Sequence, residues 1–527
     1  MNEGYVNEEQ RQVMMLGDDK DLLTAYSNVP YVLINREVDY DAAGIRKEFT
    51  EILKYYKIYK KGKKFNAEGS NGDYVPAVLR YMMIYALINK ESRFLFAEAP
   101  DITVNPKGDV GKVTQEAKDN LTAINDLIKT VLDKNRFEKI LLQASKDCFI
   151  GKRVACLVNF NEEDGIVISF VPATQFLYET KIGNKNVLSK FVCFIVVRGS
   201  SELSARRIFM KKYTLEDGVV YLEERMYDGT GREVSEGEFT PTERQPIKLS
   251  TIPAVVFVND GLTADDDGES EVEILKDFEE YYNKLANGDT DAQRKSMNPT
   301  RYTVDMDNRS TEGLSTSAGA FWDLMSDQNL DNPHPLVGML ESDMSYADAL
   351  KISLDRIKTA GFEAVDIPNV TLETMVGSIT SGKALKAIYW PLIVRCKEKM
   401  KMWGPQLSAV IDIIIEGALE YPNTITKYVN NPIVPVAYEV EVVGNTPLPE
   451  DEMEEKGMDL QEVQANVMSR KAYMKKWRGL TDDEVDEELK QMSLEKETID
   501  YSVMRADESL PYPDESDQDQ EDELVEE

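Results

Sequence analysis

The hydrophobic period changes twice along this chain, and the changes divide it into helical and β-rich parts. Apolar residues recur at helical spacing over residues 41–59, and helical patterns continue to about residue 150. Between residues 153 and 257 the runs become short, β-branched and aromatic, as in RVACLVNF and GIVISFVP, with Gly, Asp and Asn turns between them. After residue 345 helical spacing returns. This order predicts an α+β chain with an antiparallel β meander in its first half.

The same patterns give approximate bounds for individual elements. A small β-containing insertion fits residues 297–345, which lack helical periodicity. A long amphipathic helix starts near Lys383, and Trp403-Gly404-Pro405 is expected to interrupt it. Helices are predicted over 41–59, 75–90, 115–150, 271–286, 345–365, 383–402, 406–419, 450–477 and 481–496, and further strands over 102–104, 252–260 and 434–444.

The chain is strongly acidic. Lys+Arg 61 against Asp+Glu 95 gives 61 − 95 = −34, with a pI near 4.6. Tight nucleic-acid binding depends on clustered Lys and Arg that release counterions from phosphates, so this charge disfavours it. Residues 506–527 hold eleven acids and no base, which leaves −34 + 11 = −23 on the rest of the chain. An acidic tail therefore accounts for part of the charge.

Cysteine and histidine usage excludes several kinds of chemistry. The four cysteines are scattered through 527 residues, too sparse for a disulfide scaffold. The single histidine, His334, lies between prolines, so a His-based metal site or a catalytic dyad lacks its parts. We expect no enzyme activity, no cofactor and no metal. The amino terminus does not resemble a signal peptide, and the apolar run at 410–419 is too short to span a membrane.

Residues 377–383 resemble a phosphate-binding loop. Gly377, Gly382 and Lys383 match the pattern GxxxxGK, but Ala384 replaces the hydroxyl residue that binds magnesium. The alternative is a Gly-Ser loop that caps a helix, with Ser381 as the N-cap.

A second ambiguous segment is the basic run KYYKIYKKGKK at residues 54–64. Its six lysines interleaved with tyrosines fit a nucleic-acid patch. They also fit a solvated helix end, where cations complement the C-terminal dipole. The spacing alone leaves both readings open, and the second is the more common.

Seven fragments, each weak alone, follow one another in the order of a known family. The most specific is the Ser-Gly-x-Ala-Leu-Lys helix start at residues 381–386. Over residues 55–497 the chain resembles the portal, or head-to-tail connector, proteins of tailed bacteriophages, in the branch typified by long-tailed phages of Gram-positive hosts. At Glu269-Ser270-Glu271 it departs from the family's Ser-Asp pairing. The fragments are KYYKIYKKGKKF, YALINKESRFLFAEAP, ISFVPATQFLYE, IPAVVFVND with EVEILKDFEEYYNKLAN, NVTLETMVGSITSGKALKAIYWPLI, VEVVGNTPLPEDEMEE and MSRKAYMKKWRGLTDDEVDEELKQM.

The resemblance implies a portal fold of wing, stem, clip and crown. The wing would contain the β meander, and the clip would be the small β-containing insertion. The implied bounds are an N-terminal arm at 1–40, wing at 41–265 and 382–445, stem helices at 266–296 and 345–365, clip at 297–344, channel loop at 366–381, helical crown at 446–505 and a disordered acidic tail at 506–527.

The resemblance also implies a function. The family forms a ring of twelve subunits at one capsid vertex, through which a separate motor pumps DNA. Implied partners are further copies of the chain, the major capsid and scaffolding proteins, the terminase large subunit, a head-tail adaptor and double-stranded DNA bound without sequence specificity. The protein would be assembled in the host cytoplasm and then belong to the virion, with no membrane contact.

Candidate channel residues follow from this layout. Cations on the second stem helix are candidates for sparse basic rings around DNA, although solvated or inter-subunit roles remain open. Polar residues of the loop are candidates for a collar around the duplex. Two other classes stay open, a nucleotide-binding ATPase that uses residues 377–383 and an acidic scaffold or adaptor that forms no ring. The channel candidates are Lys351, Arg356, Lys358, Thr371, Thr374, Ser378 and Thr380.

Overall fold

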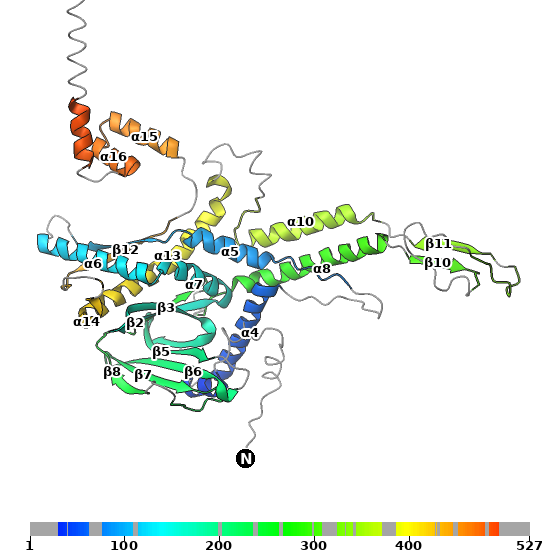
Figure 1. Ribbon diagram of the computed structural model, residues 1–527, viewed down its shortest axis with the longest axis horizontal. Helices are drawn as coiled ribbons and strands as arrows, with labels where there is room; N and C mark the ends of the chain where they lie inside the picture. The colour runs from blue at the N-terminus through cyan, green and yellow to red at the C-terminus, as the bar shows by residue number, and fades with distance from the viewer. Residues whose placement is uncertain are drawn as a thin grey trace, which may run out of the picture. The chain divides into compact units, whose positions relative to one another are not determined.

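The computed structural model combines helices with antiparallel sheets, which confirms the α+β class (Figure 1). The chain divides into two units, Met1–Gly377 with Ala387–Pro447 and Ser378–Lys386 with Leu448–Glu527. The described residues are 30–38, 41–62, 76–108, 114–198, 203–235, 241–262, 267–297, 300–307, 324–332, 334–340, 344–370, 386–426, 428, 433–445, 452–479 and 484–494.

The predicted β block forms two sheets. In the five-stranded sheet the order is β4-β5-β6-β7-β8, so this part is a meander as predicted. In the three-stranded sheet β2 lies between β3 and β9, and β9 is the strand predicted at the end of the block. The strands are β2 (Arg153–Asn161), β3 (Gly165–Pro172), β4 (Phe176–Lys181), β5 (Asn184–Arg198), β6 (Arg207–Glu216), β7 (Val219–Tyr227), β8 (Thr242–Pro246) and β9 (Ala254–Val258), with the short helices η2 (Ala173–Gln175) and η3 (Leu203–Ala205) between them.

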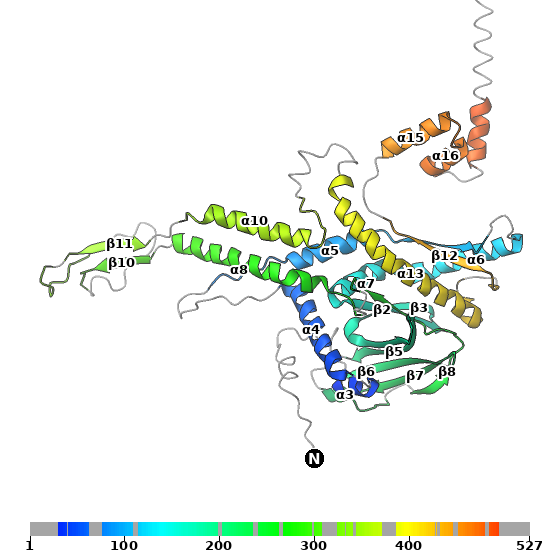
Figure 2. The same cartoon turned by 180° about the vertical axis from the view of Figure 1, so that it is seen from behind.

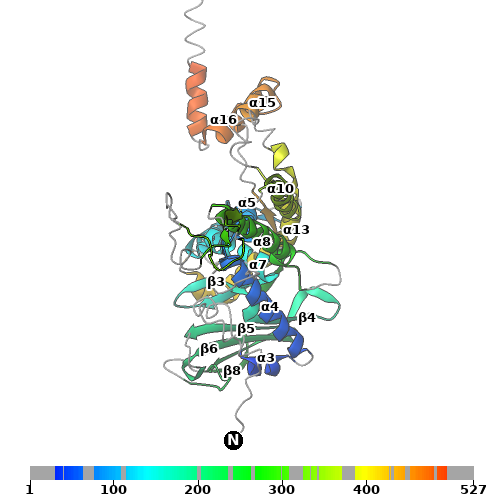
Figure 3. The ribbon, with the colours of Figure 1, turned by 90° about the vertical axis from the view of Figure 1, so that its right-hand side faces the viewer.

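Helix α3 (Tyr31–Glu37) covers one face of the five-stranded sheet (Figure 3). Its Leu33 and Ile34 pack in a core with Val192, Phe194 and other residues of β4 to β7. At its end the buried Glu37 carboxylate lies 2.7 Å from the Lys212 ammonium. The described end of the N-terminal arm is therefore part of the sheet's hydrophobic core.

Helices surround the two sheets and a further strand pair. The tyrosines of the basic run, Tyr55, Tyr56 and Tyr59, are buried, and the helix that carries them ends at Lys61. The described part of the run, residues 54–61, is therefore a packed helix with a basic end, and its tyrosines are not free to stack on bases. The elements are α4 (Ala42–Lys61), α5 (Met83–Phe96), α6 (Gln115–Lys134), α7 (Phe137–Gly151), α13 (Trp390–Glu420), α14 (Pro422–Ile425) and the antiparallel pair β1 (Asp101–Pro106) and β12 (Tyr438–Val443).

The single helix predicted over 115–150 is wrong, because the chain breaks between α6 and α7. Arg136 adopts a left-handed conformation with φ 49°. Next to it, the Asn135 side chain accepts a hydrogen bond from the Ile168 N–H and donates one to the Ile166 carbonyl, both at 2.9 Å. The break lets α7 pack beside β2 and β3, a tertiary constraint that helical periodicity does not report.

The predicted interruption at Trp403-Gly404-Pro405 is also wrong, because α13 runs through it from Trp390 to Glu420. Pro405 lies on the exposed side of the helix, where a missing backbone hydrogen bond is least costly. Two residues earlier, Trp403 is buried and its ring centroid lies 4.6 Å from that of Phe257 and 5.0 Å from that of Phe96. Packing of this tryptophan holds the helix continuous.

Residues 76–82, predicted as the start of a helix, are extended and lie along helix α8 (Glu271–Met297). The Asn287 side chain accepts from the Leu79 N–H at 2.6 Å and donates to the Leu79 carbonyl at 2.8 Å. Asn283 binds both backbone groups of Tyr81 in the same way, and Asp291 accepts from the Ala77 N–H. Two residues of an extended chain span about the same length as four residues of a helix, so each of these hydrogen bonds can form along the helix. We call residues 76–82 the strap.

Asparagine side chains also hydrogen-bond to the backbone N–H and carbonyl groups of two other extended segments. Asn125 of α6 accepts from the Val104 N–H and donates to the Val104 carbonyl, both at 2.9 Å. Asn120 of the same helix makes the equivalent pair with Val434. Because an amide offers one donor and one acceptor side by side, it satisfies the two backbone groups of an extended residue.

Helices α8 and α10 (Ala347–Glu363) lie side by side as an antiparallel hairpin (Figure 2). The predicted end of the first helix near residue 286 is wrong, because α8 continues to Met297 along the strap. Between the two helices, β10 (Thr300–Val304) and β11 (Leu336–Leu340) pair antiparallel, which confirms the predicted β-containing insertion.

The second unit contains α15 (Glu452–Gln464), α16 (Arg470–Arg478) and a helical segment at 484–494. The single helix predicted over 450–477 is wrong, since Asn466 is left-handed at φ 59° and Ser469 caps α16. Acids of the other two helices neutralise the basic α16, as in the 2.9 Å pairs of Lys476 with Asp459 and Lys471 with Asp486.

Replacing Asn287 with Ala should release the strap. Leu79 would lose both its hydrogen bonds, and such a loss costs about 1–3 kcal/mol. Chemical denaturation should show the reduced stability, and hydrogen exchange should show faster exchange at residues 77–81. Gln293→Ala on the exposed side of the same helix is the control, expected to change stability by less than about 0.5 kcal/mol. Unchanged exchange in Asn287→Ala would mean that the strap is held by other contacts.

Candidate functional site

The three candidate cations of the second stem helix lie on two different flanks of α10. Gly361, three residues after Lys358, lies against Phe278 and so marks the side of α10 that faces α8. Lys351 and Lys358 are seven residues apart and share one flank, while Arg356 falls on another. Lys351 and Arg356 are exposed, and the Lys358 ammonium lies 6.0 Å from the Phe362 ring centroid. A single face therefore cannot present all three to one duplex.

The polar candidates Thr371, Thr374, Ser378 and Thr380 lie outside the described residues, as do the phosphate-loop pattern at 377–383 and the proposed N-cap Ser381. These predictions stay predictions. The two ends of the segment, up to residue 370 and from residue 386, are described.

Helix α5 holds both ends of this loop. Lys90 donates a hydrogen bond of 2.9 Å from its ammonium to the Pro368 carbonyl and lies 5.5 Å from the Tyr389 ring centroid. One turn further on, the Phe94 ring stacks on Tyr389 at 5.9 Å. At the first end of the loop, Ile367 is buried. Pro368 and Tyr389, which lie on the two sides of the segment outside the described residues, are therefore both held by α5.

A buried cluster of charges lies near these residues. Glu91 comes from α5, Glu271 from the first turn of α8, and Arg395 and Lys399 from α13. The Lys399 ammonium lies 2.7 Å from Glu271 and 3.1 Å from Glu91. The Arg395 guanidinium lies 2.6 Å from Glu271 and 2.8 Å from Glu91. Two acids and two bases balance, and together they join three helices.

Neighbouring polar groups complete the cluster. The Asn259 side chain accepts a 2.8 Å hydrogen bond from the Lys399 ammonium and donates one to the Glu269 carbonyl. The same ammonium lies 3.9 Å from the Phe149 ring centroid. Arg395 also reaches Asp366, at 3.9 Å. The cluster thus links the end of β9, helices α5, α8 and α13, and Asp366.

The cluster shifts the pKa values of Lys399 and Glu271 toward their charged forms and that of Glu91 toward its neutral form. Burial alone would lower the pKa of Lys399, but Glu271 and Glu91 outweigh burial and raise it. Burial alone would raise the pKa of Glu271, but Lys399 and Arg395 lower it. Burial and the neighbouring Glu271 raise the pKa of Glu91. Glu271 also lies at the positive N-terminal end of α8, which favours its carboxylate.

The sequence analysis missed these four residues. Each occupies a position that its helical pattern assigns to the core, with Glu91 between Ile88 and Leu95 and Lys399 between Cys396 and Trp403. A charge on an apolar stripe is the signal that was available. Glu271 also lies in the Glu269-Ser270-Glu271 departure, where Ser270 is buried and donates 2.7 Å to the Ile150 carbonyl.

The first unit combines three features. A β-rich body carries a long helical hairpin with a small β pair between its helices, and a charge cluster joins the hairpin to Asp366. None of the helices in the described ranges combines the length and apolarity needed to cross a bilayer.

A model of a known protein family matches most of the chain. Residues 39–501 match the family described as Phage portal protein, SPP1 Gp6-like. The chain therefore belongs to this phage portal family, and the resemblance over residues 55–497 is confirmed. No match was found among curated proteins.

Removing one cation from the buried cluster should destabilise the first unit strongly. Lys399→Met leaves a buried net negative charge, and breaking a buried pair in this way costs about 3–5 kcal/mol. Thermal or urea unfolding would measure the loss. The double variant Lys399→Met with Glu271→Gln restores neutrality and should lose less than the sum of the two single changes. Strict additivity would show that the two side chains do not interact.

Proposed function

We propose that this protein forms the ring-shaped portal at one capsid vertex, a conduit for DNA packaging and ejection. Membership of the portal family over residues 39–501 carries the proposal. Family members are structural virion components, so the ring acts as a channel and a platform and performs no catalysis itself. A ring of twelve copies is the expected assembly.

The exposed hairpin supports assembly. In the chain alone, Gly361 is the buried residue of α10, and Ile352 and Tyr281 are 58% and 63% exposed. A helical pair gains stability in water chiefly by burying an apolar face. Neighbouring copies in a ring would cover these residues.

The acidity supports passage of DNA rather than retention. A channel lined by like charge repels phosphates and keeps the duplex from adhering as it moves. With the tail set aside, each copy still carries −34 + 11 = −23. Sparse basic positions such as Lys351 and Lys358 would keep the duplex centred.

The remaining parts of the proposal concern partners. The β10–β11 pair between the stem helices would form the clip that meets the terminase large subunit during packaging and the head-tail adaptor afterwards. The body would contact major capsid and scaffolding proteins. The loop of residues 366–381 would surround the duplex inside the channel.

Native mass measurement tests the ring directly. A portal gives a multiple near twelve of the 59.7 kDa chain, whereas a scaffold or adaptor that forms no ring gives a single chain. Because recombinant rings close with variable counts or stay monomeric, electron micrographs of assembled particles provide the second measurement. ATP binding that is lost in Lys383→Ala would instead favour the nucleotide-binding alternative.

Charge reversal at Lys351 or Lys358 should impair DNA packaging and leave ring assembly intact. Both side chains share a flank of α10, and a glutamate there would add repulsion along the path of the phosphates. Packaged DNA per particle is the readout, with ring formation measured on the same variants. Normal packaging in both variants would remove these lysines from the channel.

A photo-cross-linker at Thr374 should attach to DNA in filled particles, because the loop is expected to encircle the duplex. The same probe at Asn184, on the five-stranded sheet, is the control. Cross-links from the control position alone would place the loop away from the channel.

A further inference from the structure

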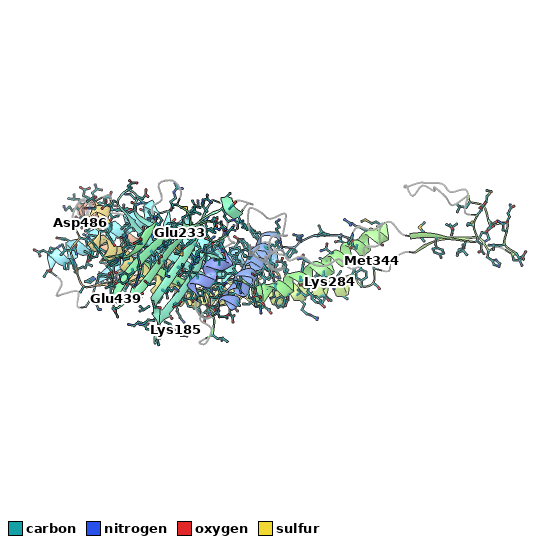
Figure 4. The ribbon with its side chains drawn as sticks, turned by 90° about the horizontal axis from the view of Figure 1, so that it is seen from below. Lys185, Glu233, Lys284, Met344, Glu439 and Asp486 are labelled. Atoms are coloured by element: carbon teal, nitrogen blue, oxygen red, sulfur yellow. The ribbon has the colours of Figure 1, made fainter. Side chains whose placement is uncertain are left out.

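Helix α8 has three faces, and the chain itself covers two of them. Asn283 and Asn287 hold the strap, while Phe278 and Asp289 contact α10 through Gly361 and Tyr346. The third face is an exposed stripe at alternating spacings of three and four residues. It contains Ile274, Asp277, Tyr281, Lys284 and Gly288, and we call it the α8 stripe (Figure 4 labels Lys284).

Gly288 is unexplained by the chain's own packing. Glycine is among the least favourable residues inside a helix. Apart from the adjacent residues and backbone of α8 itself, a Cβ added at Gly288 would meet no atom of the described residues within 4 Å, so side-chain space is open there. A glycine on an exposed helix face allows the close approach of another backbone.

Helix α10 carries a matching exposed stripe. Ile352 is its most exposed large apolar residue, at 58%. Arg356 makes no hydrogen bond or salt bridge with any part of the chain that the structure describes. We call Ala349, Ile352, Arg356, Thr359 and Glu363 the α10 stripe; it faces away from α8.

The pairing of α8 with α10 fixes the height of each stripe residue along the hairpin axis, which we call its level. Gly361 lies beside Phe278, and the Tyr346 hydroxyl donates to Asp289 at 3.3 Å. This antiparallel register sets Ala349 level with Gly288, and Arg356 level with Tyr281. Copies related by rotation about an axis along the hairpin meet at these same levels.

The two stripes are complementary in size and charge. A small residue lies level with Gly288, where two helix backbones can approach closely. Arg356 lies level with the Tyr281 ring and one turn from the Asp277 carboxylate, so a cation–π contact and an ion pair become available together. We propose that the α8 stripe of one copy packs on the α10 stripe of a second copy, with Gly288 at the closest approach. This inference rests on the proposed ring and names its stem contact.

The interface changes the role of one channel candidate. Arg356 becomes a contact between copies, while Lys351 and Lys358 lie on the other flank of α10 and stay outside it. The charge reversals that separate assembly from packaging therefore differ between the two flanks.

Cross-linking between copies tests the interface. Lys284→Cys with Ile352→Cys places one thiol on each stripe at the same level. The four native cysteines are buried, so a short bis-maleimide reacts with the introduced thiols. Rings first identified by native mass should give a ladder of covalent oligomers on a denaturing gel. Lys284→Cys with Lys351→Cys is the matched control, at the same level on the other flank, and should stay monomeric on that gel.

The outcomes separate the interface from the ring. Rings in which the control pair cross-links and the stripe pair does not would overturn the interface and leave the proposed function standing. A native mass of one chain, with no rings in assembled particles, would overturn both. In a second measurement, Gly288→Leu should raise the protein concentration for half-assembly at least about tenfold while the monomer keeps its helical circular dichroism. Assembly at the unchanged concentration would overturn the close approach at Gly288.

Discussion

The buried cluster of Glu91, Glu271, Arg395 and Lys399 is the interaction on which the first unit depends. Ions in a low-dielectric interior are tolerated only when partners and hydrogen bonds surround them, so each helix must hold its position for the others to stay paired. Apolar contacts would tolerate sliding, whereas this network does not. Helices α5, α8 and α13 and the segment at Asp366 thereby meet at one cluster.

Much of the architecture was readable from the sequence. Periodicity identified the β block, helices α8 and α10, the insertion between them and strand β12, and ordered fragments identified the portal family. Two of the failures have one cause, which is tertiary contact that overrides local pattern. Arg136 is left-handed because the Asn135 side chain hydrogen-bonds to the backbone of strand β3. Pro405 does not break α13 because Trp403 is packed in the core.

The candidate site was predictable only in part, for a physical reason. Cations on α10 can be found from sequence, but their separation onto two flanks depends on which side of the helix meets α8. The buried cluster draws on residues more than 300 positions apart, such as Glu91 and Arg395, and a lone charge in an apolar stripe does not reveal its partner. A single sequence does not show directly which residues of two distant helices lie side by side.

Asn287, which holds the strap, belongs to a sequence that can undergo slow deamidation. Asn287 is followed by Gly288, and in an unfolded chain the backbone nitrogen of that glycine can attack the asparagine side chain and convert it to aspartate. Here that nitrogen is engaged in the helix and the amide is engaged with Leu79. Hydrolysis to aspartate would remove the donor and set a carboxylate against a carbonyl. Folding of α8 against the strap therefore protects the amide that holds the strap in place.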